Sequence, residues 1–127
     1  MKLSGIGVDI IKNSRIKKMI KNKNFLKRVF SNHEILNSKK KVNKVSFFAN
    51  RFAAKEAFSK SLGSGFRNNL NFKDIVIKND SSGKPFFFIT KKVRYIINKK
   101  FKIKKFNFFL SISDEKNYSI AFVIFQK

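Results

Sequence analysis

The chain has 127 residues and a formal net charge of +23, and 43% of its residues are hydrophobic, including 17 phenylalanines. This length and apolar content predict one domain over residues 1–127 with its own core, and they exclude a disordered basic tail. Cysteine is absent, which excludes a disulfide framework, a thiolate zinc site and a cysteine nucleophile and fits a reducing cytoplasm.

The large positive charge has two interpretations. It favours an anionic partner, such as nucleic acid, a phosphate-bearing ligand or an acidic protein. However, Lys, Asn, Ile and Phe all have codons rich in A and T, and the lysines are scattered along the chain, so base composition accounts for much of the total. We also expect no membrane anchor or signal peptide, because no apolar run approaches the roughly 20 residues of a membrane span.

The first element is predicted to be a half-buried strand over residues 3–11, where apolar residues alternate with small or polar ones. One face carries Ile6, Val8 and Ile10, and the other carries Gly5, Gly7 and Asp9. Asn13 and Ser14 are good N-caps for a short amphipathic helix that follows. The strand therefore presents Asp9 beside two positions without side chains.

Two further short helices and one long helix are expected next. A helical segment covers residues 25–30, and Ser31 with Glu34 forms a capping box that opens another. After an exposed basic connection, residues 45–62 lack Gly and Pro and form the main helix. Gly63 ends this helix.

The second half of the chain predicts two hairpins around one helix. Residues 72–78 and 85–90 flank a turn, and Thr90 caps the helix that follows. Residues 106–113 and 118–125 flank the second turn. The fold class is therefore α+β, with an antiparallel sheet packed on one long helix and several short helices.

The main helix carries charged residues among alanines and phenylalanines. Arg51 and Lys55 share one side, and Glu56 and Lys60 form a separate one-turn pair. A helix that is apolar nearly all round is usually buried, so its ionic groups need partners or a ligand. The alternative is a surface Glu56–Lys60 ion pair worth about 0.3–0.5 kcal/mol.

Two acidic residues are candidate metal ligands. The chain has only seven acidic residues, and Asp9 with Glu56 could supply oxygen ligands to Mg²⁺. Because Mg²⁺ completes its shell with water and substrate phosphates, carboxylates among lysines suit phosphoryl-group chemistry. The alternative for Asp9 is a solvent-facing strand residue.

Other polar positions carry weaker signals. Gly63, Ser64 and Gly65 could offer backbone N–H groups to a phosphate, although such a sequence after a helix is more often a cap and turn. His33 is the only histidine, which excludes a multi-histidine metal site. Ser111 has no histidine near it in sequence, so a serine hydrolase has little support.

Four motifs in order resemble bacterial holo-acyl-carrier-protein synthases, the short single-domain branch of the phosphopantetheinyl transferases. They are GIGVDI, RFAAKEAFSKSLGSG, the ND-x-x-GKP turn, and SIS before a strand that contains tyrosine. The resemblance implies transfer of 4′-phosphopantetheine from coenzyme A to a serine of apo-acyl carrier protein, in fatty acid biosynthesis. It also implies the fold of that family and a homotrimer with active sites between subunits.

The resemblance also implies roles for individual residues. Asp9 and Glu56 match the Mg²⁺ ligands, and Lys60 matches a lysine that contacts the phosphates, so these three are the expected catalytic residues. Arg51 and Lys55 assist with the coenzyme A phosphates or with subunit packing. The remaining expected coenzyme A contacts are Gly63, Ser64, Gly65, Pro85 and Ser111.

The expected partner is an acidic carrier protein, held by Arg15, Lys21 and Arg28 in the N-terminal helical region. The chain departs from the family at Phe109 and Asp114, where histidine is common. The general base stays open between Glu56 and a metal-activated water. The rival class is a small nucleic-acid-binding domain, although no RNP-like aromatic pattern or recognition-helix motif is present.

Overall fold

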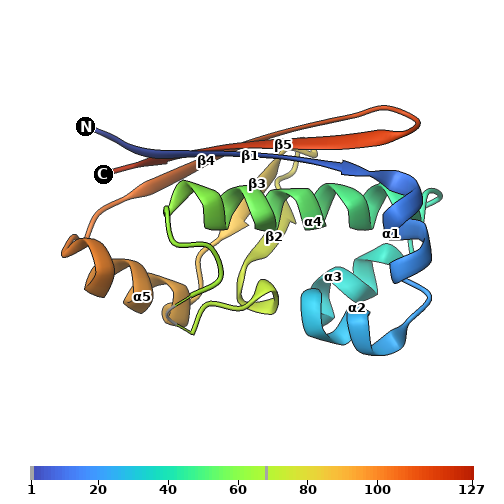
Figure 1. The fold of residues 1–127 in the computed structure, drawn as a ribbon, viewed down its shortest axis with the longest axis horizontal. Helices are drawn as coiled ribbons and strands as arrows, with labels where there is room; N and C mark the ends of the chain where they lie inside the picture. Colours follow the sequence, from blue (N-terminus) through green and yellow to red (C-terminus); the bar gives the residue numbers. More distant parts are fainter. Residues whose placement is uncertain (1, 68) are drawn as a thin grey trace.

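One long helix, α4 (Lys44–Ser61), runs across one face of a three-stranded antiparallel sheet (Figure 1). The sheet has the order β1-β5-β4, formed by β1 (Leu3–Lys12), β5 (Tyr118–Gln126) and β4 (Asn107–Asp114). The fold comes from a computed structural model that describes residues 2–67 and 69–127. The α+β class expected from the sequence is confirmed.

Strand β1 lies directly on α4 because two of its residues have no side chain. A Cβ atom at Gly5 would lie 1.9 Å from the carbonyl oxygen of Ser61, and one at Gly7 would lie 1.9 Å from that of Ala57. Only glycine permits so close an approach of two backbones. β1 and α4 run in opposite directions, so Asp9, two residues after Gly7, lies nearer the middle of α4.

Three short helices gather at one end of α4: α1 (Asn13–Met19), α2 (Lys23–Val29) and α3 (Asn32–Ser38). The capping box at the start of α3 is confirmed, because Ser31 and Glu34 bond each other's backbone N–H groups. The expected cap on α1 is wrong, because Asn13 lies inside the helix. Its side-chain amide instead donates to the carbonyl oxygens of Glu115 and Lys116 at the β4–β5 turn.

The first predicted hairpin is shorter than expected. Residues Phe72–Asp74 form a 3₁₀ turn, η1, and the paired strands are β2 (Val76–Asn79) and β3 (Pro85–Phe88). Helix α5 (Lys91–Phe101) follows, and Thr90 caps it by accepting a hydrogen bond from the Val93 N–H. Asp74 takes part in a capping box at Asn71, which favours the turn over a longer strand.

Phenylalanines fill the space between α4, the sheet and the β2–β3 hairpin. Phe58 is fully buried and stacks on Phe108, which in turn stacks on Phe125. A second group, including Phe30 and Phe48, lies between α4 and the short helices. Burial of such rings supplies most of the favourable free energy of a core of this kind.

The apolar face of β1 points away from this core, contrary to the expected burial. Ile6, Val8 and Ile10 are 58%, 55% and 60% exposed, because the glycine face is the one that contacts α4. Their neighbours across the sheet are also apolar and exposed. We call this surface the open sheet face; it consists of Ile6, Val8, Ile10, Phe109, Tyr118, Ile120 and Phe122.

Candidate active site

Asp9, Glu56 and Lys60 come together where β1 crosses α4. The Lys60 ammonium lies 3.2 Å from Asp9 Oδ1 and donates a hydrogen bond to the carbonyl oxygen of Val8 at 3.0 Å. The alternative Glu56–Lys60 ion pair does not form within the described residues, because Lys60 turns toward the strand. The three predicted catalytic residues therefore share one site.

Glu56 is a half-buried carboxylate in an unfavourable environment. Burial and the neighbouring charge of Asp9 raise the pKa of Glu56, and the cationic side chains of Lys60 and Arg15 offset only part of this effect. No hydrogen bond to its carboxylate is found in the described part of the chain. Burial, more than charge, is what disfavours the ionised form of Glu56 here, and a bound cation would offset that cost.

The donor set at this point is small. Among residues 2–67 and 69–127, no group of three or more His, Cys, Asp or Glu side chains could hold a metal ion. Two carboxylates alone suit a hard cation that takes its other ligands from water or substrate phosphates. Such a site is incomplete for zinc and for calcium.

The loop after α4 has the backbone that its glycines predict. Gly63 and Gly65 have φ angles of +76° and +62°, in the left-handed region. Gly63 ends the helix, as expected, and its N–H donates to the carbonyl oxygen of Lys60. A Cβ at either glycine would meet nothing within 4 Å, so the loop that includes Ser64 is open to a ligand.

Lys55 does not line an open surface, which argues against the expected contact with coenzyme A phosphates. Its side chain is fully buried and forms an ion pair of 2.7 Å with Glu34. The sequence pattern placed it beside Arg51 on α4, but burial of that side of the helix encloses the ammonium. Lys55 is therefore a core residue of this chain.

Arg51 lies in a separate polar cavity of about 280 Å³ beside the β2–β3 hairpin. One guanidinium N–H donates to Asn79 Oδ1, and the group lies over the Phe47 ring at 4.0 Å. Its Nε is buried and has no hydrogen-bond partner, and burial lowers the pKa of Arg51. Pro85 pairs with Asn79 across the hairpin, so it lies on the same side of the molecule as Arg51.

The other predicted residues lie apart from the carboxylates. Ser111 is exposed on β4, opposite Phe122 in register, so it belongs to the side of the open sheet face rather than to the side of Asp9. Arg15 in α1, Lys21 after α1 and Arg28 in α2 are all exposed. Arg15 alone is close enough to Glu56 to influence its pKa.

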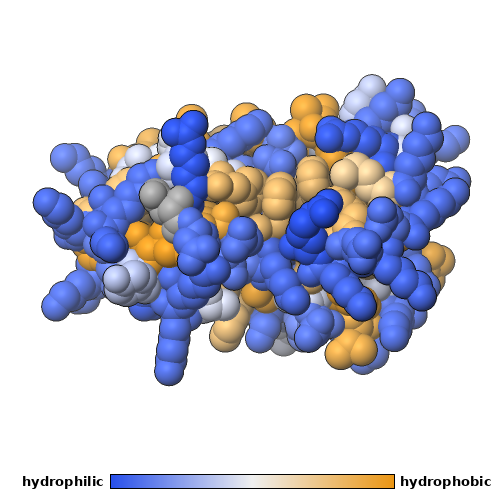
Figure 2. Space-filling model, turned by 60° about the horizontal axis from the view of Figure 1, so that its bottom comes forward, coloured by the Kyte–Doolittle hydropathy of each residue, from blue (hydrophilic) through white to orange (hydrophobic). Residues whose placement is uncertain are grey.

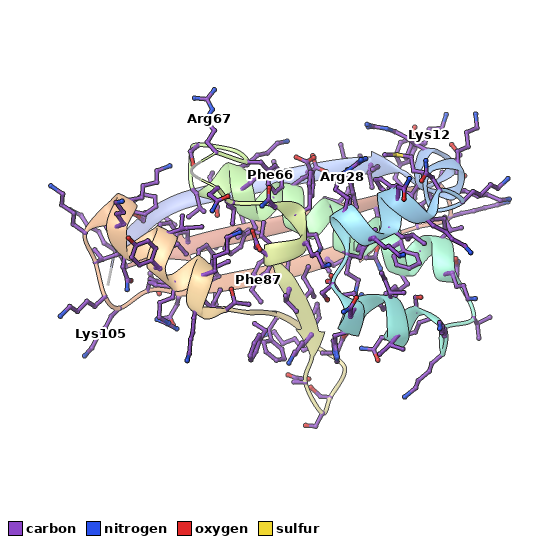
Figure 3. The ribbon with its side chains drawn as sticks, turned by 90° about the horizontal axis from the view of Figure 1, so that it is seen from below. Lys12, Arg28, Phe66, Arg67, Phe87 and Lys105 are labelled. Carbon is purple, nitrogen blue, oxygen red and sulfur yellow. The ribbon has the colours of Figure 1, made fainter. Side chains whose placement is uncertain are left out.

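Exposed basic side chains are spread from one end of the molecule to the other. Figure 2 shows hydrophilic side chains projecting around one face with apolar residues between them. In Figure 3, Lys12 and Lys105 lie at opposite ends of the molecule. Codons rich in A and T would produce such a spread of lysines. Function is therefore better inferred from individual basic residues than from the net charge.

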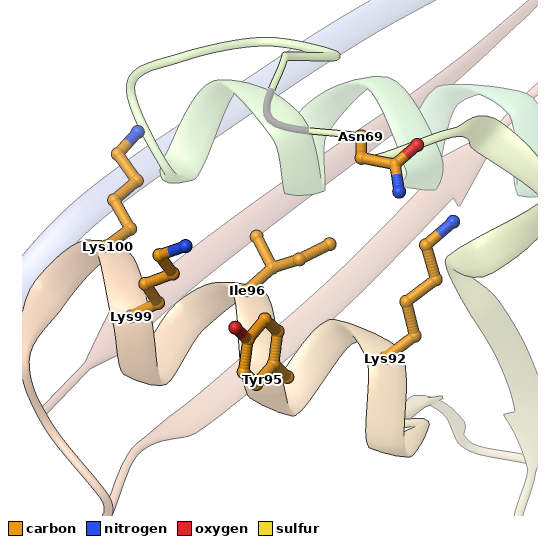
Figure 4. A pocket seen from close by; sticks show the side chains of 6 residues that line it. All are labelled: Asn69, Lys92, Tyr95, Ile96, Lys99 and Lys100. Atoms are coloured by element: carbon orange, nitrogen blue, oxygen red, sulfur yellow. The ribbon is translucent and has the colours of Figure 1, made fainter.

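A cavity of about 540 Å³ lies between α5 and the segment after α4, away from the two carboxylates (Figure 4). Lys100 lies at one end, where its ammonium donates to the Leu62 carbonyl oxygen at 2.8 Å. Burial, with the charge of Arg67, lowers the pKa of Lys100. Lys92, at the other end, is paired with Asp74, and none of the expected site residues lines this cavity.

Two polar contacts outside the carboxylate site were missed in the sequence. Glu34 is the buried partner of Lys55. From the sequence, Glu34 was predicted only to form the capping box of α3. Asp114 accepts hydrogen bonds from Ser46 and Asn50, which tie the end of β4 to the start of α4. A buried lysine on an apolar helix signals that a carboxylate partner exists, but it does not identify which one.

A carboxylate pair beside a lysine, at a glycine-lined crossing of strand and helix, is an arrangement that suits a phosphate-bearing substrate. The model of the 4′-phosphopantetheinyl transferase superfamily matches residues 5–123, and the chain belongs to this family. A holo-[acyl-carrier-protein] synthase of Pelagibacter ubique is 65% identical over 127 residues, which are 100% of this chain and 99% of the relative.

Solved structures agree with this assignment. The crystal structure of the holo-[acyl-carrier-protein] synthase from Neisseria meningitidis matches with a TM-score of 0.87 and 35% identity, over 98% of this chain and 99% of the other. The Helicobacter pylori synthase, in complex with coenzyme A, matches with a TM-score of 0.78 and 34% identity, over 95% and 99% of the two chains. No helix among the described residues is long and apolar enough to cross a membrane.

Proposed function

We propose that the chain transfers 4′-phosphopantetheine from coenzyme A to a serine of apo-acyl carrier protein, with release of adenosine 3′,5′-bisphosphate, in fatty acid biosynthesis. The convergence of Asp9, Glu56 and Lys60 in a member of this family carries the proposal. The named synthases that it resembles over nearly their whole length support the choice of substrates.

Asp9 and Glu56 would hold Mg²⁺ in this reaction. The fit rests on the raised pKa of Glu56, whose carboxylate is disfavoured by burial and by Asp9, and on a donor set that leaves most coordination positions to water and phosphate. When bound there, Mg²⁺ supplies charge neutralisation at the diphosphate of coenzyme A. Lys60 would exchange its contact with Asp9 for one with a phosphate.

The reaction joins the serine oxygen to the β-phosphorus of coenzyme A and breaks the bond from that phosphorus to the bridging oxygen. Lys60 stabilises the negative charge that develops on the departing nucleotide. The serine proton would leave either to Glu56 or to a water activated by the cation that Asp9 and Glu56 would hold.

Coenzyme A contacts are assigned to two separate groups of residues. The first group consists of Lys60, beside the carboxylates, and of Gly63, Ser64 and Gly65 in the loop after α4. The second group lies on the other side of α4 and consists of Arg51 and Pro85, with Ser111 on the open sheet face. The buried, partly unpaired guanidinium of Arg51 suits a phosphate group in its cavity.

These two groups can serve one substrate only if different subunits supply them. Arg51 and Glu56 are about 140° apart around α4, at 100° per residue, so they face different sides of one chain. The open sheet face offers an apolar surface for subunit contact. We therefore propose a homotrimer with active sites between subunits.

The carrier protein would dock on α1 and α2, where Arg15, Lys21 and Arg28 are exposed. Arg15 lies close enough to the carboxylates to affect Glu56, so a carrier held there would reach the site. Opposite charge accelerates such an encounter and makes it sensitive to salt.

A transfer assay tests the proposal directly. Purified chain, coenzyme A, Mg²⁺ and apo-acyl carrier protein are mixed, and intact mass spectrometry follows the addition of one phosphopantetheine per carrier. We expect transfer by the wild type and none by Glu56→Ala. Absence of transfer by a folded wild-type protein would refute the function, and transfer that persists after removal of divalent cations would refute the Mg²⁺ assignment.

A further inference from the structure

Glu34 and Lys55 form a fully buried ion pair outside the reaction centre. The Lys55 ammonium lies 2.7 Å from Glu34 Oε1, and both side chains are at most 1% exposed. Burial lowers the pKa of Lys55, and Glu34 opposes this effect. Neither residue can touch coenzyme A or the carrier from the core, so the reaction mechanism does not use them.

The pair joins five elements with a complete set of hydrogen bonds. The ammonium uses its three donors on Glu34, on the carbonyl oxygen of Val29 at 2.8 Å and on that of Phe72 at 3.0 Å. The Glu34 carboxylate also accepts from the N–H groups of Ser31 and Ile77. Elements α2, α3, η1 and β2 are thereby fixed to one point on α4.

Stability alone does not account for this pair. Two buried charges cost several kcal/mol each in desolvation, and well-packed apolar residues in their place are often as stable or more stable. The surrounding core already contains Phe30 and Phe72, so apolar replacements would have suitable neighbours. The pair adds directional constraints, because each hydrogen bond fixes the distance and angle between two groups, which apolar contacts leave free.

The positions that it fixes bear on carrier docking. Val29, whose carbonyl oxygen Lys55 binds, follows Arg28, which is exposed in the last turn of α2. On α4, Lys55 immediately precedes Glu56, so anchoring one side of the helix also fixes the rotation of the other. The same ammonium thus links the docking helix to the carboxylate at the reaction centre.

We infer that Glu34 and Lys55 are positioning residues, which hold α2 in register with α4 so that a docked carrier presents its serine to the Glu56 site. This inference rests on the proposed transfer function. It predicts a defect in carrier use that is separate from coenzyme A binding and from stability. Coenzyme A use should stay unchanged, since its proposed contacts lie outside α2 and α3, and Arg51 and Pro85 keep their own link through Asn79 when Glu34 no longer holds Ile77 on the same strand.

The test compares variants by steady-state kinetics, with apo-carrier and coenzyme A varied in turn. Lys55→Met alone leaves a buried unpaired carboxylate and is strongly destabilising, so it serves only to show that the pair is coupled. The informative variant is Glu34→Gln with Lys55→Met, which removes both charges and keeps an acceptor for the capping box. Lys92→Met, which breaks the partly exposed pair with Asp74 2.8 Å away and leaves Asp74 in its capping box, is the control.

We expect the neutral double variant to fold, with its KM for apo-carrier raised about tenfold, and its KM for coenzyme A unchanged. The control should keep both values. Wild-type KM for the carrier in the folded double variant would overturn the inference, as would an equal rise for both substrates. If the wild type transfers nothing, the proposed function fails. The positioning role is then tested by titrating labelled apo-carrier with each protein and following fluorescence anisotropy. A double variant that binds the carrier as tightly as the wild type overturns the positioning role, and one that binds it more weakly supports that role.

Discussion

The contact between Gly7 and the backbone of α4 gives the sharpest prediction. In Gly7→Ala, the new Cβ would lie 1.9 Å from the Ala57 carbonyl oxygen and 2.8 Å from the Ser61 nitrogen. Both are backbone atoms, so no side chain can rotate away. To reach an ordinary contact of 3.4 Å, the strand must retreat by about 1.5 Å, which is severe overpacking.

The expected cost is about 3 kcal/mol, at the upper end of overpacking in cores, and it lowers the Tm by about 10 °C for a domain of this size. The retreat also moves Asp9, two residues along the same strand face, away from Glu56. A shift of about 1 Å in a reacting group can cost about 100-fold in rate. Transfer activity per folded molecule should therefore fall by about that factor.

Gly5→Ala separates the two effects. Its Cβ would lie equally close to the Ser61 carbonyl oxygen, but Gly5 is four residues from Asp9 instead of two. Thermal unfolding by circular dichroism should show similar losses of Tm for both variants. The transfer assay, run well below both Tm values, should show the larger loss in Gly7→Ala. A Gly7→Ala protein within about 2 °C of the wild-type Tm, which is under about 1 kcal/mol, would refute the close-packed crossing.

Three further predictions concern the site and the open sheet face. Glu56→Gln should raise the Tm at pH 7 and leave it unchanged near about pH 3.5, because a carboxylate whose folded-state pKa is raised destabilises the fold only once it ionises. Differential scanning fluorimetry measures both Tm values. A Tm of the variant at pH 7 equal to or below that of the wild type would contradict this reasoning. Lys60→Ala should lower kcat/KM by about 100-fold, while its exposed ion pair with Asp9 contributes at most about 1 kcal/mol to stability; Lys104→Ala, an exposed lysine elsewhere, is the control and should match the wild type. Val8→Lys, which places a charge on the open sheet face, should convert a trimer to monomers in light scattering and abolish transfer, and a fully active monomer would show that one chain makes the whole site.

Most of the elements could be predicted from local patterns. The capping box at Ser31, the cap at Thr90 and the glycine end of α4 depend only on residues within a few positions of one another, and the structure contains all three. The Asn13 cap failed because its side-chain oxygen, the atom that would cap the helix, accepts from the hydroxyl of Ser119, 106 positions away. Local propensity cannot anticipate a tertiary hydrogen bond of that kind.

The burial of β1 was mispredicted for a physical reason. Alternation of apolar and small residues indicates that one face is buried, and the apolar face is normally that one. Here the glycine face is buried because it admits the backbone of α4, and Ile6, Val8 and Ile10 are left exposed. The spacing of Gly5 and Gly7 was visible in the sequence, but their partner on α4 was not.

The same helix explains why a single chain carries its polar residues in two separate groups. Lys60 and Glu56 are one turn apart toward β1, and Arg51 and Lys55 are one turn apart toward the short helices and the hairpin. If all four side chains lay on one side of α4, the apolar opposite side could pack against only one layer of the fold. With two polar sides, α4 binds β1 through glycines on one side and anchors α2 and α3 through Lys55 on the other. The proposed active site between subunits and the inner ion pair are thus both consequences of one helix that is buried nearly all round.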